Sequence, residues 1–188
     1  MIEEISIHWF RQDLRLSDNP SLNFLSESYK NLVGIFILDE FNSDIKLGSA
    51  SKIWLHHSLV YLNKQLNNNL LIFKGDPKEI FDKILNQNKV NQISWNRCYE
   101  PWIIKRDKSL KDFLKMKVEV KTFNGSLLWE PWEVLKADGT PYKIFTPFYQ
   151  RGCLKKKTPR KPVSNKLFFF NHKIKSLEIN ELNLAKSF

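Results

Sequence analysis

Cysteine and glycine are scarce in this chain of 188 residues, which contains two cysteines and six glycines. Cys98 and Cys153 lie far apart and form no Cys-x-x-Cys pair, so we expect no disulfide framework and no zinc site, and a reducing cytoplasm fits. No apolar run approaches the roughly 18 residues that a membrane helix needs. The acidic start Met1-Ile2-Glu3-Glu4 argues against a signal peptide. We therefore expect a cytoplasmic protein without a membrane partner.

The few glycines also exclude two common phosphate-binding loops. No Gly-x-Gly-x-x-Gly follows the first apolar run, and no Walker-type Gly-Lys-Ser/Thr loop is present, so an ordinary NAD or ATP enzyme is a poor interpretation. The four histidines have no metal-ligand spacing with cysteines or carboxylates, so no metal site is expected.

Positive charge is abundant, with lysine and arginine exceeding aspartate and glutamate by ten. Such a charge favours encounters with polyanions, including nucleic acid, without saying which. Much of the excess lies at Lys155, Lys156, Lys157, Arg160 and Lys161. We interpret this run as a solvated connecting segment in preference to a dedicated DNA-binding patch.

Short apolar runs alternate with helical patterns in the first 125 residues. Residues 32–38 (LVGIFIL) are apolar almost without interruption, as is typical of a strand covered on both faces. Asp18 and Pro20 predict a helix start, and Leu55, Leu59, Leu62 and Leu66 predict one face of a long helix. Further strands are expected at 5–9, 70–73, 92–95 and 118–123, and further helices from 77 and from 101 to about 114. The alternation predicts an α/β fold, a Rossmann-like doubly wound five-stranded parallel sheet flanked by helices, in the order 3-2-1-4-5.

The alternation of predicted strands and helices ends after Asn124, so we place one α/β domain at residues 1–130 and a connecting segment at 131–188. That segment holds two aromatic groups, one at Phe145, Phe148 and Tyr149 and one at Phe168–Phe170. Aromatic side chains in a polar tail need a surface to pack on, so we expect an apolar face for a partner, with poor solubility or self-association in isolation.

A ligand is expected where the order of such a sheet reverses, between strands one and four. The loops at 10–19 and 96–101 meet there and combine aromatic walls with a few fixed charges, which suits a flat heteroaromatic ligand. The candidate binding residues are Arg11, Asp13, Asp39, Ser49, Lys52, Glu100 and Trp102. Two alternatives stay open: the arginines and aspartates can instead form a structural salt-bridge network, and Glu100 can cap the next helix.

Four segments of the chain, at residues 9–19, 48–59, 95–107 and 139–148, contain motifs that resemble those of the DNA photolyase and cryptochrome family. Trp9–Asn19 is similar to its W-F-R-x-D-L-R-x-x-D-N signature, and Gly48–Leu59 resembles the long helix of bacterial class I cyclobutane pyrimidine dimer photolyases. Trp95–Trp102, followed by Arg106 and Asp107, is similar to a fourth-strand motif of that group, in which a second arginine is usual where Cys98 stands. Gly139–Phe148 resembles the segment that leads toward the catalytic domain. Four motifs in the family's order are a specific signal.

The resemblance implies an α/β domain that holds an auxiliary light-absorbing pigment, commonly a folate or a deazaflavin. In the family a following helical domain binds FAD, which donates an electron to a pyrimidine dimer flipped out of DNA. We expect this chain to lack that FAD domain, to be catalytically inactive alone, and to have no catalytic residues. Its partners would be the FAD-binding domain, from the same gene or a split one, and damaged DNA through the complete enzyme.

One departure from the family's sequence pattern narrows the choice of pigment. Trp102-Ile103 stands where folate-binding photolyases carry Asn-Glu, which favours a deazaflavin or a flavin over methenyltetrahydrofolate. Two other functions are weighed: a cryptochrome-type blue-light sensor module, and a nucleotide-binding protein of the universal-stress type. The latter needs a glycine-rich phosphate loop late in the chain, and Gly125 and Gly152 stand without one.

Overall fold

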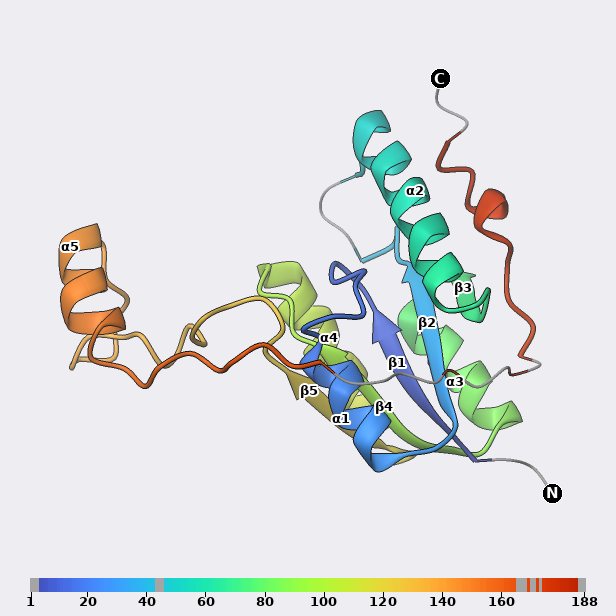
Figure 1. Ribbon diagram of the computed structural model, residues 1–188, viewed down its shortest axis with the longest axis horizontal. Helices are drawn as coiled ribbons and strands as arrows, with labels where there is room; N and C mark the ends of the chain where they lie inside the picture. Colours follow the sequence, from blue (N-terminus) through green and yellow to red (C-terminus); the bar gives the residue numbers. More distant parts are fainter. Residues whose placement is uncertain (1–3, 43–45, 165–168, 170–171, 173, 186–188) are drawn as a thin grey trace. The chain divides into compact units, whose positions relative to one another are not determined.

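Five parallel strands alternate with four helices in the first 125 residues of the computed structural model (Figure 1), which describes residues 4–42, 46–164, 169, 172 and 174–185. The strand order is β3-β2-β1-β4-β5, so the predicted doubly wound sheet is confirmed. The elements are β1 Ile5–Phe10, α1 Pro20–Ser28, β2 Leu32–Leu38, α2 Ser49–Gln65, β3 Leu70–Lys74, α3 Pro77–Gln87, β4 Val90–Asn96, α4 Pro101–Leu114 and β5 Glu119–Phe123.

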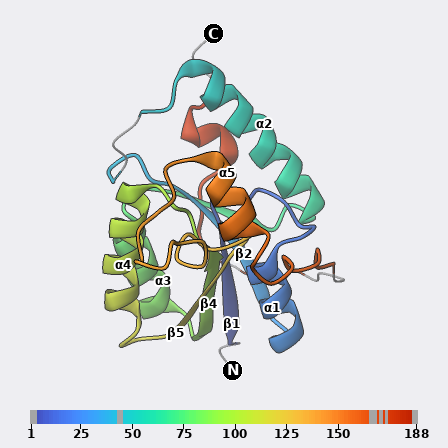
Figure 2. The ribbon, with the colours of Figure 1, turned by 90° about the vertical axis from the view of Figure 1, so that its left-hand side faces the viewer.

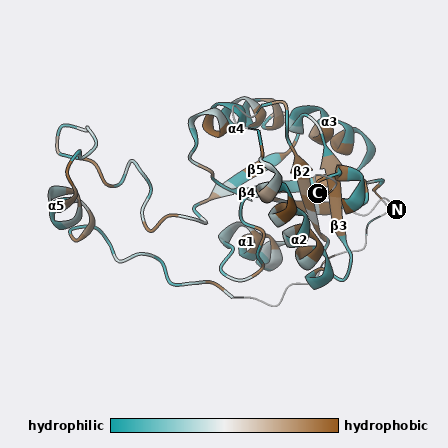
Figure 3. Cartoon of the chain, turned by 90° about the horizontal axis from the view of Figure 1, so that it is seen from above, coloured by the Kyte–Doolittle hydropathy of each residue, from teal (hydrophilic) through white to brown (hydrophobic). Residues whose placement is uncertain are grey.

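The central strands are buried along their whole length. Every residue of β1 and β2 is buried, whereas the edge strand β5 is partly exposed. Helices α3 and α4 cover one face of the sheet and α1 and α2 cover the other (Figure 2). In Figure 3, β2 and β3 are largely hydrophobic and the helices combine apolar and polar faces. A strand covered on both faces has no solvent side, which explains the unbroken apolar run of β2.

Two apolar clusters fill the space on either side of the sheet. Odd-numbered residues of β1, such as Ile7 and Trp9, pack with Phe81 of α3 and Leu110 of α4. On the other face the cluster joins β1 and β2 to α1 and α2, and the predicted leucine face of α2 is confirmed. Successive strand residues point to opposite faces, so the period of two in β1 distributes its side chains between both clusters.

The N-cap residue of helix α1 lies one position later than the sequence pattern predicts. The side chain of Asn19 accepts a hydrogen bond from the backbone N of Leu22 at 3.2 Å, so Asn19 is the cap and the expected cap at Asp18 is wrong. Asp18 instead has a positive φ of 46° and accepts a hydrogen bond from the backbone N of Val163 at 3.2 Å. Its carboxylate therefore attaches a distant segment to the loop after β1.

The C-terminal segment returns to the sheet. Phe169 forms a parallel bridge with Leu32, and the backbone N of Leu177 donates to the oxygen of Ile72 at 2.8 Å. A short 3₁₀ helix, η2 (Ile179–Leu182), follows beside α2 (Figure 1). Phe169 packs into the α1/α2 cluster, where Gly34 leaves room for its ring. Phe169 is thus half-buried within this chain, while Phe168 and Phe170 lie outside the described residues.

The chain forms two compact units. The sheet unit comprises residues 1–125 and 163–188, and the second unit comprises residues 126–162. Within the second unit, α5 (Phe145–Pro147) leads into a π-helical turn, η1 (Phe148–Cys153), and the rings of Phe145 and Tyr149 stack 5.8 Å apart. Within the described ranges, no helix has the length and apolar character needed to cross a membrane.

Candidate functional site

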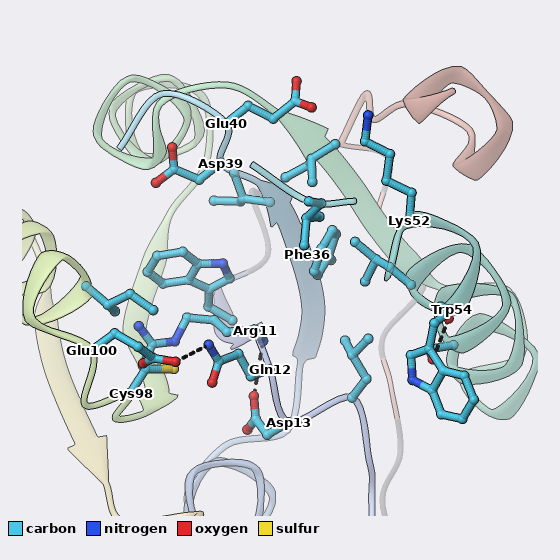
Figure 4. A pocket seen from close by; sticks show the side chains of 18 of the residues that line it. Arg11, Gln12, Asp13, Phe36, Asp39, Glu40, Lys52, Trp54, Cys98 and Glu100 are labelled. Carbon is cyan, nitrogen blue, oxygen red and sulfur yellow. Dashed lines mark hydrogen bonds between the residues drawn. The ribbon is translucent and has the colours of Figure 1, made fainter. Parts of the chain in front are cut away.

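A cavity of about 1000 Å³ lies at the carboxyl ends of β1, β2 and β4 (Figure 4). The loops at 10–19 and 96–101 share it, as the reversal of strand order predicts. Six of the seven predicted binding residues line it, namely Arg11, Asp13, Asp39, Lys52, Glu100 and Trp102. Ser49 does not line it, and lies exposed at the first position of α2.

Arg11 forms the centre of the cavity floor and is 8% exposed. Its Nη1 donates to Oδ2 of Asp107 at 2.6 Å, and its Nη2 donates to the backbone oxygen of Asn96. The guanidinium also lies 5.1 Å from the ring centroid of Trp9. Both terminal nitrogens therefore hold α4 and the end of β4 against the loop after β1.

Asp107 connects two arginines through its two carboxylate oxygens. Its Oδ1 accepts from Nη2 of Arg106 at 2.9 Å, while Oδ2 accepts from Arg11. Arg106 in turn donates to Oδ2 of Asp39 at 3.1 Å, which joins α4 to the loop after β2. Oδ1 of Asp39 accepts from the backbone N of Phe41 and so stabilises a turn. Asp39 is a wall residue whose oxygens are already hydrogen-bonded by the protein.

Both carboxylate oxygens of Asp13 likewise accept hydrogen bonds from other groups of the protein. Its Oδ2 accepts from Nδ2 of Asn96 at 2.5 Å and from Asn19 at 3.3 Å, and its Oδ1 accepts from the backbone N of Arg11. Of the two interpretations left open by the sequence, these contacts support the structural network for Arg11 and Asp13. A bound molecule would meet a floor whose polar groups are already fixed.

Beneath this floor, His8 is completely buried in β1. Its Nδ1 lies 3.0 Å from Oγ of Ser21, which lies 2.7 Å from Oγ of Ser94, and its Nε2 lies 3.4 Å from Nδ2 of Asn19. Burial lowers the pKa of His8 to about 4, a further decrease comes from Arg11, and Asp13 opposes it. His8 is therefore neutral at physiological pH and serves to join β1, β4 and α1.

Glu100 belongs to the rim of the cavity. It occupies the N-cap position of α4, but its side chain makes no capping hydrogen bond to the helix. Its Oε1 instead accepts from Nε2 of Gln12 at 2.7 Å, across the mouth between the two loops (Figure 4). Although burial raises the pKa of Glu100, the hydrogen bonds from Gln12 and from the backbone lower it overall. A carboxylate therefore faces the mouth.

The rest of the rim combines aromatic rings with a cation. Trp102 lies half-buried on α4, and Trp54 lines the opposite side from α2 with 79% of its surface exposed. Lys52, also on α2, lines the cavity and forms no ion pair with any described carboxylate. Trp54 therefore lies at the rim of the cavity.

Among the described residues that line the cavity, no nucleophile is combined with a base. Cys98 lines the wall, but burial raises the pKa of its thiol to about 11, so the thiol stays protonated. The described residues contain no cluster of histidine, cysteine and carboxylate groups suited to a metal ion. Fold and site together define the class: an α/β domain with a large cavity at the reversal point of its sheet.

The family assignment follows from comparison with known proteins. The family model described as DNA photolyase matches residues 6–165, so this chain belongs to the DNA photolyase family. It is 36% identical over 148 residues to deoxyribodipyrimidine photo-lyase of Agrobacterium fabrum, covering 77% of this chain and 30% of that protein. It is 34% identical over 155 residues to cryptochrome-1 of Arabidopsis thaliana, covering 79% of this chain and 22% of that protein.

Solved structures agree with this assignment. A class III photolyase from Agrobacterium tumefaciens superposes with a TM-score of 0.87 and 31% identity, over 98% of this chain and 39% of the other. An archaeal photolyase from Sulfolobus tokodaii, solved with two FAD molecules, shares the fold with a TM-score of 0.73 and 21% identity over 96% of this chain and 41% of the other. The expected closeness to class I photolyases stays a prediction. The chain spans less than a third of the length of the two sequence relatives.

Proposed function

We propose that the sheet unit is the light-harvesting domain of a deoxyribodipyrimidine photolyase and holds an auxiliary pigment in the cavity of about 1000 Å³. The observation that carries the proposal is the combination of a fixed polar floor with an aromatic rim. A pigment that transfers excitation energy through space needs a rigid, water-poor slot and no acid, base or nucleophile. The cavity has the size of a small-molecule site and the neutral thiol of Cys98 offers no chemistry there.

The favoured pigment is a deazaflavin or a flavin. Trp54 and Trp102 stand on opposite helices at the rim and can flank a flat ring system. Gln12, Glu100 and Lys52 supply a donor, an acceptor and a cation toward the polar atoms of such a ring or its side chain. The Sulfolobus photolyase, whose structure holds two FAD molecules and implies a novel light-harvesting cofactor, supports a flavin in this fold.

Repair chemistry would belong to an additional domain. We propose that a helical FAD-binding domain, encoded in the same gene or separately, supplies catalysis, and that damaged DNA binds to the complete enzyme. The second unit would form the connection to it, because Phe145 is 72% exposed and Ile144 is 69% exposed. The chain alone is then inactive in dimer repair.

An absorption spectrum of the purified protein tests the pigment first. We expect a near-ultraviolet or blue band from a co-purified pigment, or recovery of such a band on adding a deazaflavin or a flavin. Titrations with a deazaflavin, riboflavin phosphate and methenyltetrahydrofolate then rank the three classes by fluorescence quenching. Saturable binding of none of them, or repair of dimers by this chain without another domain, would refute the proposal.

A blue-light sensor module is the second candidate, supported by the 34% identity to cryptochrome-1. Sensor and repair proteins would use the same cavity, so pigment binding does not separate them. The discriminating experiment combines this chain with the helical domain encoded nearest to it and measures loss of cyclobutane dimers under blue light. Repair supports the photolyase assignment, whereas flavin photoreduction without repair supports the sensor.

A further inference from the structure

The chain leaves the sheet unit at Gly125 and returns to it at Val163, and residues 126–162 of the second unit lie between these two positions in the sequence. Both Gly125 and Val163 are hydrogen-bonded to the loop after β1, at residues 10–19, which we call the β1 loop. The exit point and the return point of the chain are thus attached to one short stretch of the sheet unit.

Asp18 of the β1 loop holds the return point. Its backbone N donates to the oxygen of Val163 at 2.9 Å, and the backbone N of Val163 donates to Oδ1 of Asp18 at 3.2 Å. Asp18 has a φ of 46°, a left-handed conformation that few residues other than glycine, asparagine and aspartate adopt. Such a conformation persists where surrounding contacts hold it, and the two hydrogen bonds to Val163 are contacts of this kind.

Arg15 of the β1 loop holds the exit point. Its Nη2 donates to the oxygen of Gly125 at 2.5 Å and to the oxygen of Asp18 at 3.0 Å, so one nitrogen joins the exit point to the residue that holds the return point. Gly125 also packs closely on Asn96, because a Cβ at this position would lie 2.6 Å from Cγ of Asn96. A larger residue at position 125 would therefore displace Asn96.

The β1 loop also forms part of the cavity. Residues 11–15 line it, and Figure 4 shows the side chains of the first three of them. The loop is hydrogen-bonded within itself, because the backbone N of Arg15 donates to the oxygen of Asp13 at 2.7 Å and Nδ2 of Asn19 donates to the oxygen of Arg15 at 3.1 Å. The shape of the cavity wall therefore depends on the same loop that holds Gly125 and Val163.

We propose that Arg15 and Asp18 are positioning residues that couple pigment affinity to the attachment of Gly125 and Val163. The inference rests on the proposed pigment site and adds a regulation of that site. A pigment that contacts the β1 loop stabilises the loop shape in which both attachments form. By thermodynamic linkage, the attachments then raise pigment affinity by the factor by which the pigment stabilises them. A domain that binds the second unit would act on the same two points, so its binding would change pigment affinity.

The test changes Asp18, because this residue does not line the cavity. Asp18→Gly removes the carboxylate and adopts a positive φ without strain. Asp18→Asn is the conservative variant, since asparagine tolerates this φ and its amide oxygen can accept from Val163. The matched control is Asp138→Gly, which removes an exposed carboxylate that accepts from the backbone N of Thr140 at 2.9 Å within the second unit.

The first measurement is pigment affinity of the full chain, by fluorescence titration with riboflavin phosphate, or with a deazaflavin if the flavin does not bind. Asp18→Gly should bind about fivefold more weakly, at the low end of usual coupling factors, because Asp18 and Val163 are only half-buried. Asp18→Asn and Asp138→Gly should bind as tightly as the unmodified chain.

The second measurement follows the same coupling at the return point. Hydrogen–deuterium exchange of the full chain is recorded by mass spectrometry with and without saturating pigment. Pigment should slow exchange of the peptide that contains Val163 in the unmodified chain, and this effect should be lost in Asp18→Gly. A purely structural role of Asp18 would leave exchange at Val163 independent of pigment.

Equal pigment affinities of Asp18→Gly and Asp138→Gly would overturn the coupling, as would exchange at Val163 that does not respond to pigment. Either result leaves the proposed light-harvesting role standing. Absence of saturable binding of every pigment by the unmodified chain would overturn both proposals. If Asp18→Gly does not fold, the response of Val163 to pigment in the unmodified chain decides the question.

Discussion

The floor and the rim of the cavity differ in how their polar groups are used. The floor consists of Arg11, Asp13 and Arg106, which line the cavity, and of Asn96 and Asp107 behind them. Apart from the buried Nε of Arg11, the polar groups of these side chains form hydrogen bonds with other groups of the protein. The rim, formed by Gln12, Lys52, Trp54, Glu100 and Trp102, has one internal hydrogen bond between Gln12 and Glu100. The difference teaches that residues lining one cavity can serve two purposes: the floor fixes the shape and the rim is available to a ligand.

Removal of the central carboxylate of the floor should have the largest effect. Asp107→Ala leaves Arg11 and Arg106 without their shared partner in a buried site, so the free energy of unfolding should fall by about 3–5 kcal/mol. Urea unfolding followed by circular dichroism measures it. Asp112→Ala on the same helix removes an exposed pair with Lys115 and should cost less than about 1 kcal/mol. Equal losses would erase the distinction between buried and exposed carboxylates.

The histidine beneath the floor should make stability depend on pH. The pKa of His8 is lowered by burial from 6.5 to about 4, so between these values the unfolded chain binds more protons than the folded protein. The free energy of unfolding should therefore fall as pH decreases from 6.5 to 4, by roughly 3 kcal/mol.

Unfolding midpoints measured across this pH range check the effect. His8→Gln should remove this part of the pH dependence, whereas His57→Gln, at an exposed position of α2, should retain it. An unchanged pH profile in His8→Gln would assign the acid sensitivity to other groups.

A rim residue should affect ligand affinity and leave stability unchanged. Trp54→Ala removes an exposed indole, so pigment affinity should fall about tenfold while the free energy of unfolding changes by less than about 0.5 kcal/mol. Fluorescence titration and urea unfolding give the two values. Trp132→Ala, an exposed tryptophan that does not line the cavity, is the control. A loss of stability without a loss of affinity would place Trp54 among the structural residues.

The smallest effect is expected at the rim cation. Lys52→Met should weaken binding of a pigment with an anionic or acceptor group by about threefold, because a solvent-accessible charge contributes below about 1 kcal/mol. The difference should shrink at high salt. Lys30→Met, at an exposed position outside the cavity, should not change the affinity. A loss larger than that of Trp54→Ala would mean that charge rather than stacking holds the pigment.

Most of the cavity could be predicted because parallel strands bring their carboxyl ends to one edge. The apolar run of residues 32–38 and its neighbours predicted the order of the sheet, and the order selected the two loops that share the cavity. Ser49 does not line the cavity, although Lys52 of the same helix does. The sequence pattern could not show how far from the strand end that helix starts.

The ion pairs of α4 were missed, although the sequence contains a signal for them. Asp107 lies four residues after Ile103 and three before Leu110, and these two apolar residues are buried. A carboxylate on the apolar face of a helix needs a buried cation, so this spacing could have predicted a partner for Asp107. It could not have identified Arg11, which is 96 residues away.

The sequence by itself determined the alternation of strands and helices, because the period of its apolar residues specifies which faces are buried. Only the tertiary structure decided which charges remain available. Burial of Arg11, Asp13 and Asp107 depends on segments far apart in the chain that meet at one sheet edge, and the return of Phe169 to β2 depends on the space that Gly34 leaves. Local patterns contain no information on such contacts, because the free energy of a buried charge depends on the partner brought beside it.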